Sequence, residues 1–188
     1  MTFNLQKYRE IKDFIEKNTL KKEKKATIIA ISKSKPLISV REAINSGIRI
    51  FGENRVQEAT AKFLLLKKEY EDIELHLTGP LQTNKVKSAL NIFDFFHTLD
   101  REKLAVEFSK YPESTTNKKF FIQINIGSED QKSGISIKES NEFIKFCIND
   151  LKMNVVGLMC IPPINDDPKI YFSNLKKIAN KNNLKQLS

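Results

Sequence analysis

Long apolar runs are missing from this 188-residue sequence, and cysteine is scarce. No run approaches the roughly 18 apolar residues that a membrane-spanning helix needs, so an integral membrane protein is excluded. The first ten residues include acidic side chains and no apolar segment typical of a signal peptide. Cys147 and Cys160 stand in apolar surroundings, which predicts buried reduced thiols rather than a disulfide or a metal-binding pair. We therefore expect a cytoplasmic protein without a metal site.

The formal net charge of +9 raises the question of a nucleic-acid partner. The lysines are spread along the whole chain, and their densest run, residues 21–25, has no aromatic residues interleaved. A solvated linker before the first strand explains this run better, so no nucleic-acid partner is expected. The content of 40% apolar and 29% charged residues is that of one soluble globular domain with a real core.

Short apolar runs typical of strands alternate with segments of helical periodicity. This alternation predicts βαβ units and a parallel sheet. The expected strands are residues 26–33, 49–53, 73–79, 93–99, 120–127 and 154–161, with a seventh beginning at 184–188. The expected helices are residues 3–17, 39–47, 54–66, a short one after 83, 100–108, 138–149 and 168–182. A capping box at Ser39–Glu42 and caps at Asn54 and Asp100 mark three of the helix starts.

Two of the predicted strands have one polar face. Glu74, His76 and Thr78 alternate with apolar residues in the third strand, and Gln123 and Asn125 do so in the fifth. A polar face inside a parallel sheet indicates the lumen of a barrel, although an edge strand with one wet face explains it too. We predict a TIM-type (β/α)8 barrel with about six βα units, because 188 residues are few for eight. A doubly wound open sheet of about six strands is the alternative.

Lys33 ends the first predicted strand, and Pro36 then turns the chain. Parallel sheets and barrels bind their ligands at this carboxyl edge. Desolvation and crowding by Lys35 would lower the pKa of the Lys33 amine, leaving it able to attack a carbonyl. The plain alternative is a solvated strand end, since Lys33 is one of 27 lysines.

Several segments, taken together, resemble the pyridoxal-phosphate homeostasis protein family, whose members look like the barrel domain of alanine racemase standing alone. The resemblance covers residues 30–188 in family order and spacing. The matching segments are Ser32-Lys33-Ser34-Lys35-Pro36, Phe51-Gly52-Glu53-Asn54, His76 with Gly79-Pro80-Leu81-Gln82-Thr83-Asn84-Lys85, His97-Thr98-Leu99-Asp100-Arg101, Gln123-Ile124-Asn125 with Lys132-Ser133-Gly134, and Gly157-Leu158-Met159.

The resemblance implies that Lys33 forms the internal aldimine with pyridoxal 5′-phosphate. Lys35 and Lys132 match basic positions near the mouth of the cofactor site, and Asn54, His76 and Met159 match positions that line it. Each lining residue has a structural alternative: a helix cap for Asn54, a satisfied core histidine for His76 and core packing for Met159. The segment at residues 79–85 is expected either to cradle an anion or to form a capped turn.

The sequence departs from the family pattern at Leu75, Thr78 and Arg55, where an aromatic, a branched apolar residue and a tyrosine are usual. It also stops where the last two strands of the family barrel would follow, with the serine and Gly-Ser-Thr donors to the cofactor phosphate and the arginine near the pyridine nitrogen. We therefore expect one barrel domain over residues 1–188, truncated at its C-terminus, with weak cofactor binding. The family is monomeric, but open barrel edges favour pairing between chains.

The expected function is binding and carriage of pyridoxal phosphate, with cofactor-requiring enzymes as partners and without robust catalysis. A racemase-like site needs a second acid or base, usually supplied by another domain, so no catalytic residue is assigned. One rival function is that of an amino-acid racemase or lyase that uses the same lysine. The other is a basic α/β module that binds nucleic acid or protein without a cofactor.

Overall fold

The computed structural model describes residues 3–19, 26–127, 129 and 133–188. Eight parallel strands form its sheet, in the order β1-β2-β3-β4-β5-β7-β8, with β6 paired to β5 beside this path. The strands are β1 (Ala30–Ile31), β2 (Ile50–Glu53), β3 (Glu74–Leu77), β4 (Phe95–Leu99), β5 (Lys119–Asn125), β6 (Ile135–Ser136), β7 (Val155–Met159) and β8 (Gln186–Leu187).

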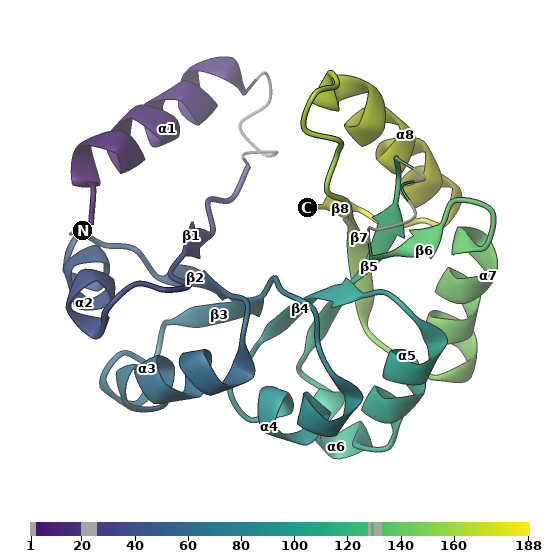
Figure 1. Cartoon of the computed structure of the whole chain (residues 1–188), viewed down its shortest axis with the longest axis horizontal. Helices are drawn as coiled ribbons and strands as arrows, with labels where there is room; N and C mark the ends of the chain where they lie inside the picture. The colour runs from purple at the N-terminus through teal and green to yellow at the C-terminus, as the bar shows by residue number, and fades with distance from the viewer. Residues whose placement is uncertain (1–2, 20–25, 128, 130–132) are drawn as a thin grey trace.

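Helices cover the outer face of this curved sheet (Figure 1). They are α2 (Leu37–Asn45), α3 (Val56–Glu69), η2 (Thr83–Lys85), α4 (Val86–Leu90), α5 (Glu102–Ser109), α6 (Pro112–Thr115), α7 (Ser140–Lys145), η3 (Phe146–Asp150) and α8 (Pro168–Lys181). The first helix, α1 (Leu5–Asn18), has no buried residue and lies beyond the β1 end of the sheet (Figure 1). None of the helices in the described ranges is both long and apolar enough to span a bilayer.

The sheet curves into an open ring, with α1 and β1 at one end and α8 and β8 at the other (Figure 1). Consecutive strands lie side by side, apart from the short β6. A doubly wound sheet would reverse its strand order at a switch point, so the alternative of an open doubly wound sheet is wrong. The predicted incomplete barrel is confirmed: within the described residues, β1 pairs only with β2 and β8 only with β7.

The strand register separates two faces of the sheet. Leu75, Leu77, Ile122 and Ile124 point to the helices and belong to the main core. The side chains that alternate with them face the lumen. The polar faces predicted for the third and fifth strands are therefore lumen faces, as the barrel interpretation requires.

Aromatic packing fills the space between sheet and helices. Phe96 on β4 stacks on Phe120 of β5 at 5.3 Å between ring centroids, and Phe108 of α5 meets Phe96 edge-on at 4.9 Å. All three side chains are fully buried. Offset and edge-on ring pairs stabilise a core beyond the area that they bury, so this cluster anchors α5 to the strands beside it.

The predicted helix caps are wrong. α2 begins after Pro36, one turn earlier than predicted, and Ser39 lies buried inside it. Neither α3 nor α5 has a side-chain cap, because the Asn54 amide accepts a hydrogen bond from Thr78 and Asp100 pairs with Arg101. The two-residue strand β6 was not predicted, since so short a pairing leaves no periodic pattern.

Candidate functional site

Lys33 lies in a tight turn at the carboxyl end of β1, where the sequence placed it. The Ser32 amide still donates to the Gly52 carbonyl, and the Lys35 amide donates to the Ser32 carbonyl at 3.1 Å. Ile31 is the last paired residue of β1, opposite Gly52, so Lys33 follows the end of β1 by two residues, as Asn54 follows Gly52 on the neighbouring chain segment. Both Lys33 and Lys35 are exposed, so the expected desolvation of Lys33 is wrong for this structure.

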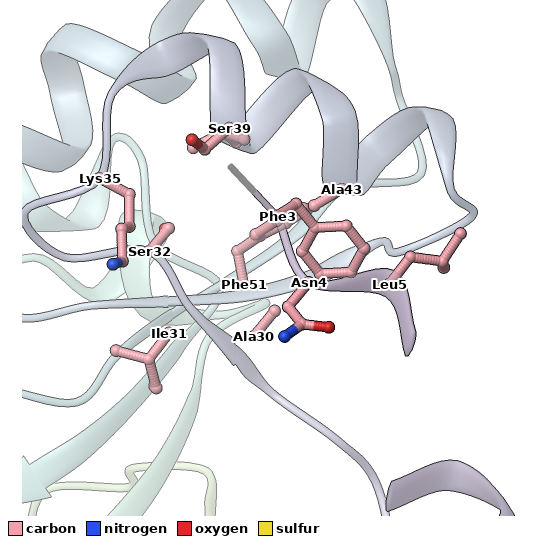
Figure 2. Close-up of a pocket in the computed structure, with 11 residues that line it drawn as sticks. Phe3, Asn4, Leu5, Ala30, Ile31, Ser32, Lys35, Ser39, Ala43 and Phe51 are labelled. Atoms are coloured by element: carbon pink, nitrogen blue, oxygen red, sulfur yellow. The ribbon is translucent and has the colours of Figure 1, made fainter. Parts of the chain in front are cut away.

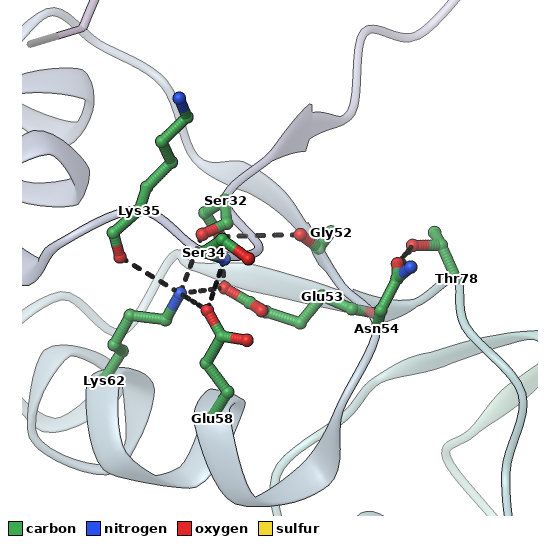
Figure 3. Close-up of polar contacts among 9 residues, drawn as sticks. All are labelled: Ser32, Ser34, Lys35, Gly52, Glu53, Asn54, Glu58, Lys62 and Thr78. Carbon is green, nitrogen blue, oxygen red and sulfur yellow. Dashed lines mark hydrogen bonds and ion pairs between the residues drawn. The ribbon is translucent and has the colours of Figure 1, made fainter. Parts of the chain in front are cut away.

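A buried polar network supports this turn from the helix side (Figure 3). Lys62, on the inner face of α3, donates to the Ser32 carbonyl at 2.7 Å and to Glu58 at 2.9 Å, and it forms an ion pair with Glu53. Glu53 is fully buried and also accepts a hydrogen bond from the Ser32 hydroxyl at 2.7 Å. Its second oxygen has no partner among the described residues.

Glu58 connects the same network to the middle of the turn. It accepts a hydrogen bond from the Ser34 amide as well as from Lys62. The Lys62 hydrogen bond, followed by the one from Ser34, lowers the pKa of Glu58 below its usual value against the opposing effect of burial. The carboxylate is therefore charged at neutral pH, as a bridge between an ammonium group and a backbone amide requires.

A second network crosses the lumen. The His76 Nε2 lies 2.8 Å from Glu74, the His76 Nδ1 lies 2.8 Å from the His97 Nε2, and the His97 Nδ1 lies 2.8 Å from the Ser188 hydroxyl. Burial lowers the pKa of His76, and burial followed by the neighbouring His76 lowers the pKa of His97 to about 3. Both imidazoles are neutral at pH 7, so each has one donor and one acceptor nitrogen.

The direction of every hydrogen bond in this network follows from two facts: both imidazoles are neutral, and the Glu74 carboxylate is an acceptor. Glu74 can only accept, so the His76 Nε2 carries the proton and its Nδ1 accepts from the His97 Nε2. The His97 Nδ1 then accepts from the Ser188 hydroxyl. His76 thus has both nitrogens bonded and only 4% of its surface exposed, as the core-histidine interpretation expects.

Flat rings line the lumen around these histidines. His76 stacks on Phe95 at 4.3 Å with an interplanar angle of 5°, and His97 stacks on Phe121 at 4.4 Å. Met159 packs with Phe95 and Phe121 in a small cluster separate from the main core. The lumen wall is thus apolar and aromatic as well as polar, and Met159 belongs to it.

Two cavities open at the carboxyl edge of the sheet. One, of about 250 Å³, is lined by uncharged side chains that include Thr78, Gln123 and Ser133. The other, of about 670 Å³, is lined by Asn54 and by residues of the loops after β2, β3 and β4. Carboxyl-edge cavities are where parallel α/β folds bind their ligands, so these two are the candidate site.

Basic residues and a close backbone contact shape the larger cavity. Arg55, Lys85 and Arg101 line it. Gly79 lies against Asn54 so closely that an added Cβ would sit 2.5 Å from the Asn54 backbone oxygen. The predicted capped turn at residues 79–85 is wrong in one respect, because neither η2 nor α4 has a side-chain cap.

Lys35 lines a different cavity from the two at the carboxyl edge. This one, of about 590 Å³, lies between the N-terminal segment, β1 and α2, and its walls include Phe3, Ser39 and Phe51 (Figure 2). Lys33, Asn54 and Met159 therefore each lie at the carboxyl end of a strand, but of these three only Asn54 lines one of the two carboxyl-edge cavities. His76 lies one layer below, within β3. Lys132 lies outside the described residues.

Sequence reasoning missed the supporting residues. Lys62 follows Glu58 by four residues and shares the buried face of α3 with Ala59, Phe63 and Leu66. A lysine in the apolar stripe of a helix indicates that a buried carboxylate pairs with it, so a buried ion pair at Lys62 could have been predicted from the sequence. The partner Glu53 could not be identified, because it lies on another element.

Comparisons with known proteins agree with this architecture. Residues 10–187 match the family model "Alanine racemase, N-terminal domain". A pyridoxal phosphate homeostasis protein from Buchnera aphidicola is 38% identical over 180 residues, which cover 90% of this chain and 78% of the relative. The protein of that name from Aquifex aeolicus is 35% identical over 157 residues, covering 81% of this chain and 68% of the relative.

Solved structures of known proteins have the same fold as this chain. PipY of Synechococcus elongatus, solved without PLP, superposes with a TM-score of 0.81 at 26% identity and covers 97% of this chain and 86% of its own. The same protein with PLP bound gives a TM-score of 0.75 at 25% identity with the same coverage. The resemblance identified from the sequence is confirmed: the chain belongs to the alanine racemase N-terminal domain family and, within it, to the pyridoxal phosphate homeostasis proteins.

Proposed function

We propose that this chain binds pyridoxal 5′-phosphate and acts in the homeostasis and carriage of this cofactor in the cytoplasm, with Lys33 as the point of attachment. The observation that carries the proposal is the position of Lys33, in an exposed turn at the carboxyl end of β1. The names of the relatives and the PLP-bound PipY structure support the choice of cofactor.

The residues present fit the aldehyde and ring of this cofactor. When bound, it supplies an aldehyde that condenses with a lysine amine, releasing water and giving a Schiff base. Lys33 makes no hydrogen bond or ion pair within the described part of the chain, so its amine is available. The Ser133 hydroxyl and the second N–H of the Gln123 amide offer neutral donors in the smaller cavity, whereas the Thr78 hydroxyl already donates to Asn54.

Other residues are assigned to the surroundings of the cofactor. We propose that Asn54 and Met159 line it, with His76 beneath, and that Lys35 and Lys132 contribute positive charge at the mouth. Two observations support the first group: Asn54 directly follows β2, the strand paired with β1, and Met159 belongs to the ring-lined wall. Lys85 in the adjoining cavity offers further positive charge for a phosphate group, whereas Arg101 there is paired with Asp100.

We propose that the chain carries the cofactor and does not use it to catalyse a reaction on amino acids. The buried imidazoles of the lumen are neutral and bonded to one another, to Glu74 and to Ser188. A racemase-like reaction needs an acid or base free to exchange a proton with substrate. Apo forms of cofactor-requiring enzymes are the proposed recipients, and their recovery of activity when mixed with the loaded chain measures the transfer.

Absorbance spectroscopy of the Schiff base tests the attachment point. The wild-type chain is expected to develop the visible band at a cofactor concentration high enough to offset the expected weak binding, and Lys33→Ala to lose it. Lys87→Ala removes an exposed lysine of α4 and serves as the matched control. Borohydride reduction followed by peptide mapping should place the modification on Lys33. An undiminished band in Lys33→Ala would refute the assignment.

Association between copies is proposed through the open sheet edges. β1 and β8 each have one unpaired side in the described structure, and Ile31 and Leu187 on them are 47% and 39% exposed. Unpaired strand edges with apolar side chains promote pairing between chains. Sedimentation velocity across a hundredfold range of concentration is expected to show a dimer at the high end, and a constant monomer would contradict this.

A further inference from the structure

We infer that Lys62 is a positioning residue: its ammonium group holds the turn at residues 32–35 so that the Lys33 amine faces the lumen. This inference rests on the proposed role of Lys33. It adds a function for a buried lysine on another element, α3, which touches neither cavity at the carboxyl edge.

The geometry places Lys62 directly behind the turn (Figure 3). Its Nζ donates to the Ser32 carbonyl at 2.7 Å and lies 3.4 Å from the Lys35 carbonyl. These carbonyls belong to the residue before Lys33 and to the residue two positions after it. Glu58, bonded to Lys62, holds the Ser34 amide between them. The backbone on both sides of Lys33 is therefore tied down, while the Lys33 side chain is left out of the network.

The turn needs such support because its own backbone is unfavourable. Ser34 has a φ of 58°, in the left-handed region that residues other than glycine seldom adopt. Such a conformation persists where surrounding contacts fix it, and it is common at functional sites. Here those contacts come from Glu58 and, through it, from Lys62.

Stability alone is a poor explanation for a buried lysine at this position. The Lys62 side chain is 9% exposed and Glu53 is completely buried, so both groups have lost their hydration. An apolar pair of similar size is often as stable as a buried ion pair or more so. Such a pair could not bond the Ser32 and Lys35 carbonyls. What the ammonium adds is therefore a fixed backbone beside Lys33.

The test uses a variant that removes the charges together. Lys62→Met alone leaves Glu53 buried without a partner, which threatens folding. The double variant Lys62→Met/Glu53→Gln removes both charges and keeps an acceptor for the Ser32 hydroxyl. Glu58→Gln, at a carboxylate that is 30% exposed, is a milder second variant. Lys68→Met, at an exposed lysine on the same helix, is the control.

Two measurements are made on each folded variant. Amide hydrogen exchange of Ser34 and Lys35 reports the order of the turn without any cofactor, and it is expected to accelerate at least tenfold in the double variant. The equilibrium constant for the Schiff base is expected to weaken by about tenfold to a hundredfold, the effect of losing a charged hydrogen bond. Glu58→Gln should change the exchange rate and the Schiff-base constant in the same direction but by less. Lys68→Met should change neither quantity.

Each outcome decides between the inference and its rivals. Unchanged exchange at Ser34 and Lys35 in the double variant overturns it, because the turn then holds without Lys62. Faster exchange with an unchanged Schiff-base constant also overturns it, because order in the turn then does not position Lys33. A wild-type chain that forms no Schiff base at all refutes the proposed function instead, and the exchange data still decide whether Lys62 fixes the turn.

Discussion

Acid is expected to weaken this fold through His97 well before the carboxylates titrate. Burial and the neighbouring His76 lower the pKa of His97 to about 3 in the folded chain, against an ordinary value of 6.5. Between pH 6.5 and about 3, His97 is therefore protonated in the unfolded chain but not in the folded chain. The free energy of unfolding falls as the pH drops from 6.5 towards 3, and above 6.5 this group has no effect.

The size of the effect follows from the two pKa values. Each pH unit between them is worth about 1.4 kcal/mol, so lowering the pH from 7.5 to 5.0 removes about 2 kcal/mol through His97. The lowered pKa of His76 acts in the same direction. The hydrogen bond between the two histidines also opposes protonation of His76, because a proton on the His76 Nδ1 would point at the N–H of His97 and set two donors against each other.

Urea unfolding at the two pH values, in wild type and in His97→Gln, measures this effect. The glutamine removes the titrating group and can still donate to His76. The loss of unfolding free energy between pH 7.5 and 5.0 should be about 2 kcal/mol smaller in the variant than in wild type. An NMR titration should show His97 neutral at pH 5.0. Equal losses in the two proteins would refute the reasoning.

Two further predictions concern packing and the thiols. Gly79→Ala is expected to lower the free energy of unfolding by about 1–3 kcal/mol in urea, since the new Cβ would meet the backbone of Asn54, and an unchanged midpoint would contradict the close contact. Burial raises the pKa of Cys147 to about 12 and that of Cys160 to about 11, so both thiols should react with Ellman's reagent at pH 8 only after unfolding. Rapid reaction of the native chain would show that the thiols are accessible.

The sheet could be predicted from the sequence because its signal is local. Alternation in the third and fifth strands reflects a side-chain period that any half-buried strand must have, so Leu75 and Ile122 were correctly assigned to the core face. The first strand was predicted too long, over residues 26–33, whereas β1 spans only Ala30–Ile31. The apolar residues before Ala30 extend the sequence pattern typical of a strand, but the length of β1 is set by its pairing with β2, which includes only two residues.

Helix starts and the supporting contacts of the site could not be predicted in the same way. Asn54 is a good capping residue, but its side-chain amide oxygen accepts a hydrogen bond from Thr78, just after β3 and 24 positions along the chain. Tertiary contacts of this kind override local preference. The position of Lys33 at the end of a strand could be predicted because strand ends are visible in sequence. The bonds that Lys62 makes behind it depend on how α3 packs on β1 and β2, and no local pattern encodes that.

The two polar networks differ in the length of chain that each must close. The contacts that Lys62 makes beside Lys33 join residues no more than 30 positions apart, whereas the bond between His97 and Ser188 spans 91. Short loops close at lower entropic cost, and domains emerge from the ribosome with the N-terminal part first. The turn around Lys33 is therefore expected to be ordered early in synthesis, while the histidine pair receives its partner Ser188 much later. A ribosome-bound nascent chain that ends after α3 should already protect the Ser34 amide.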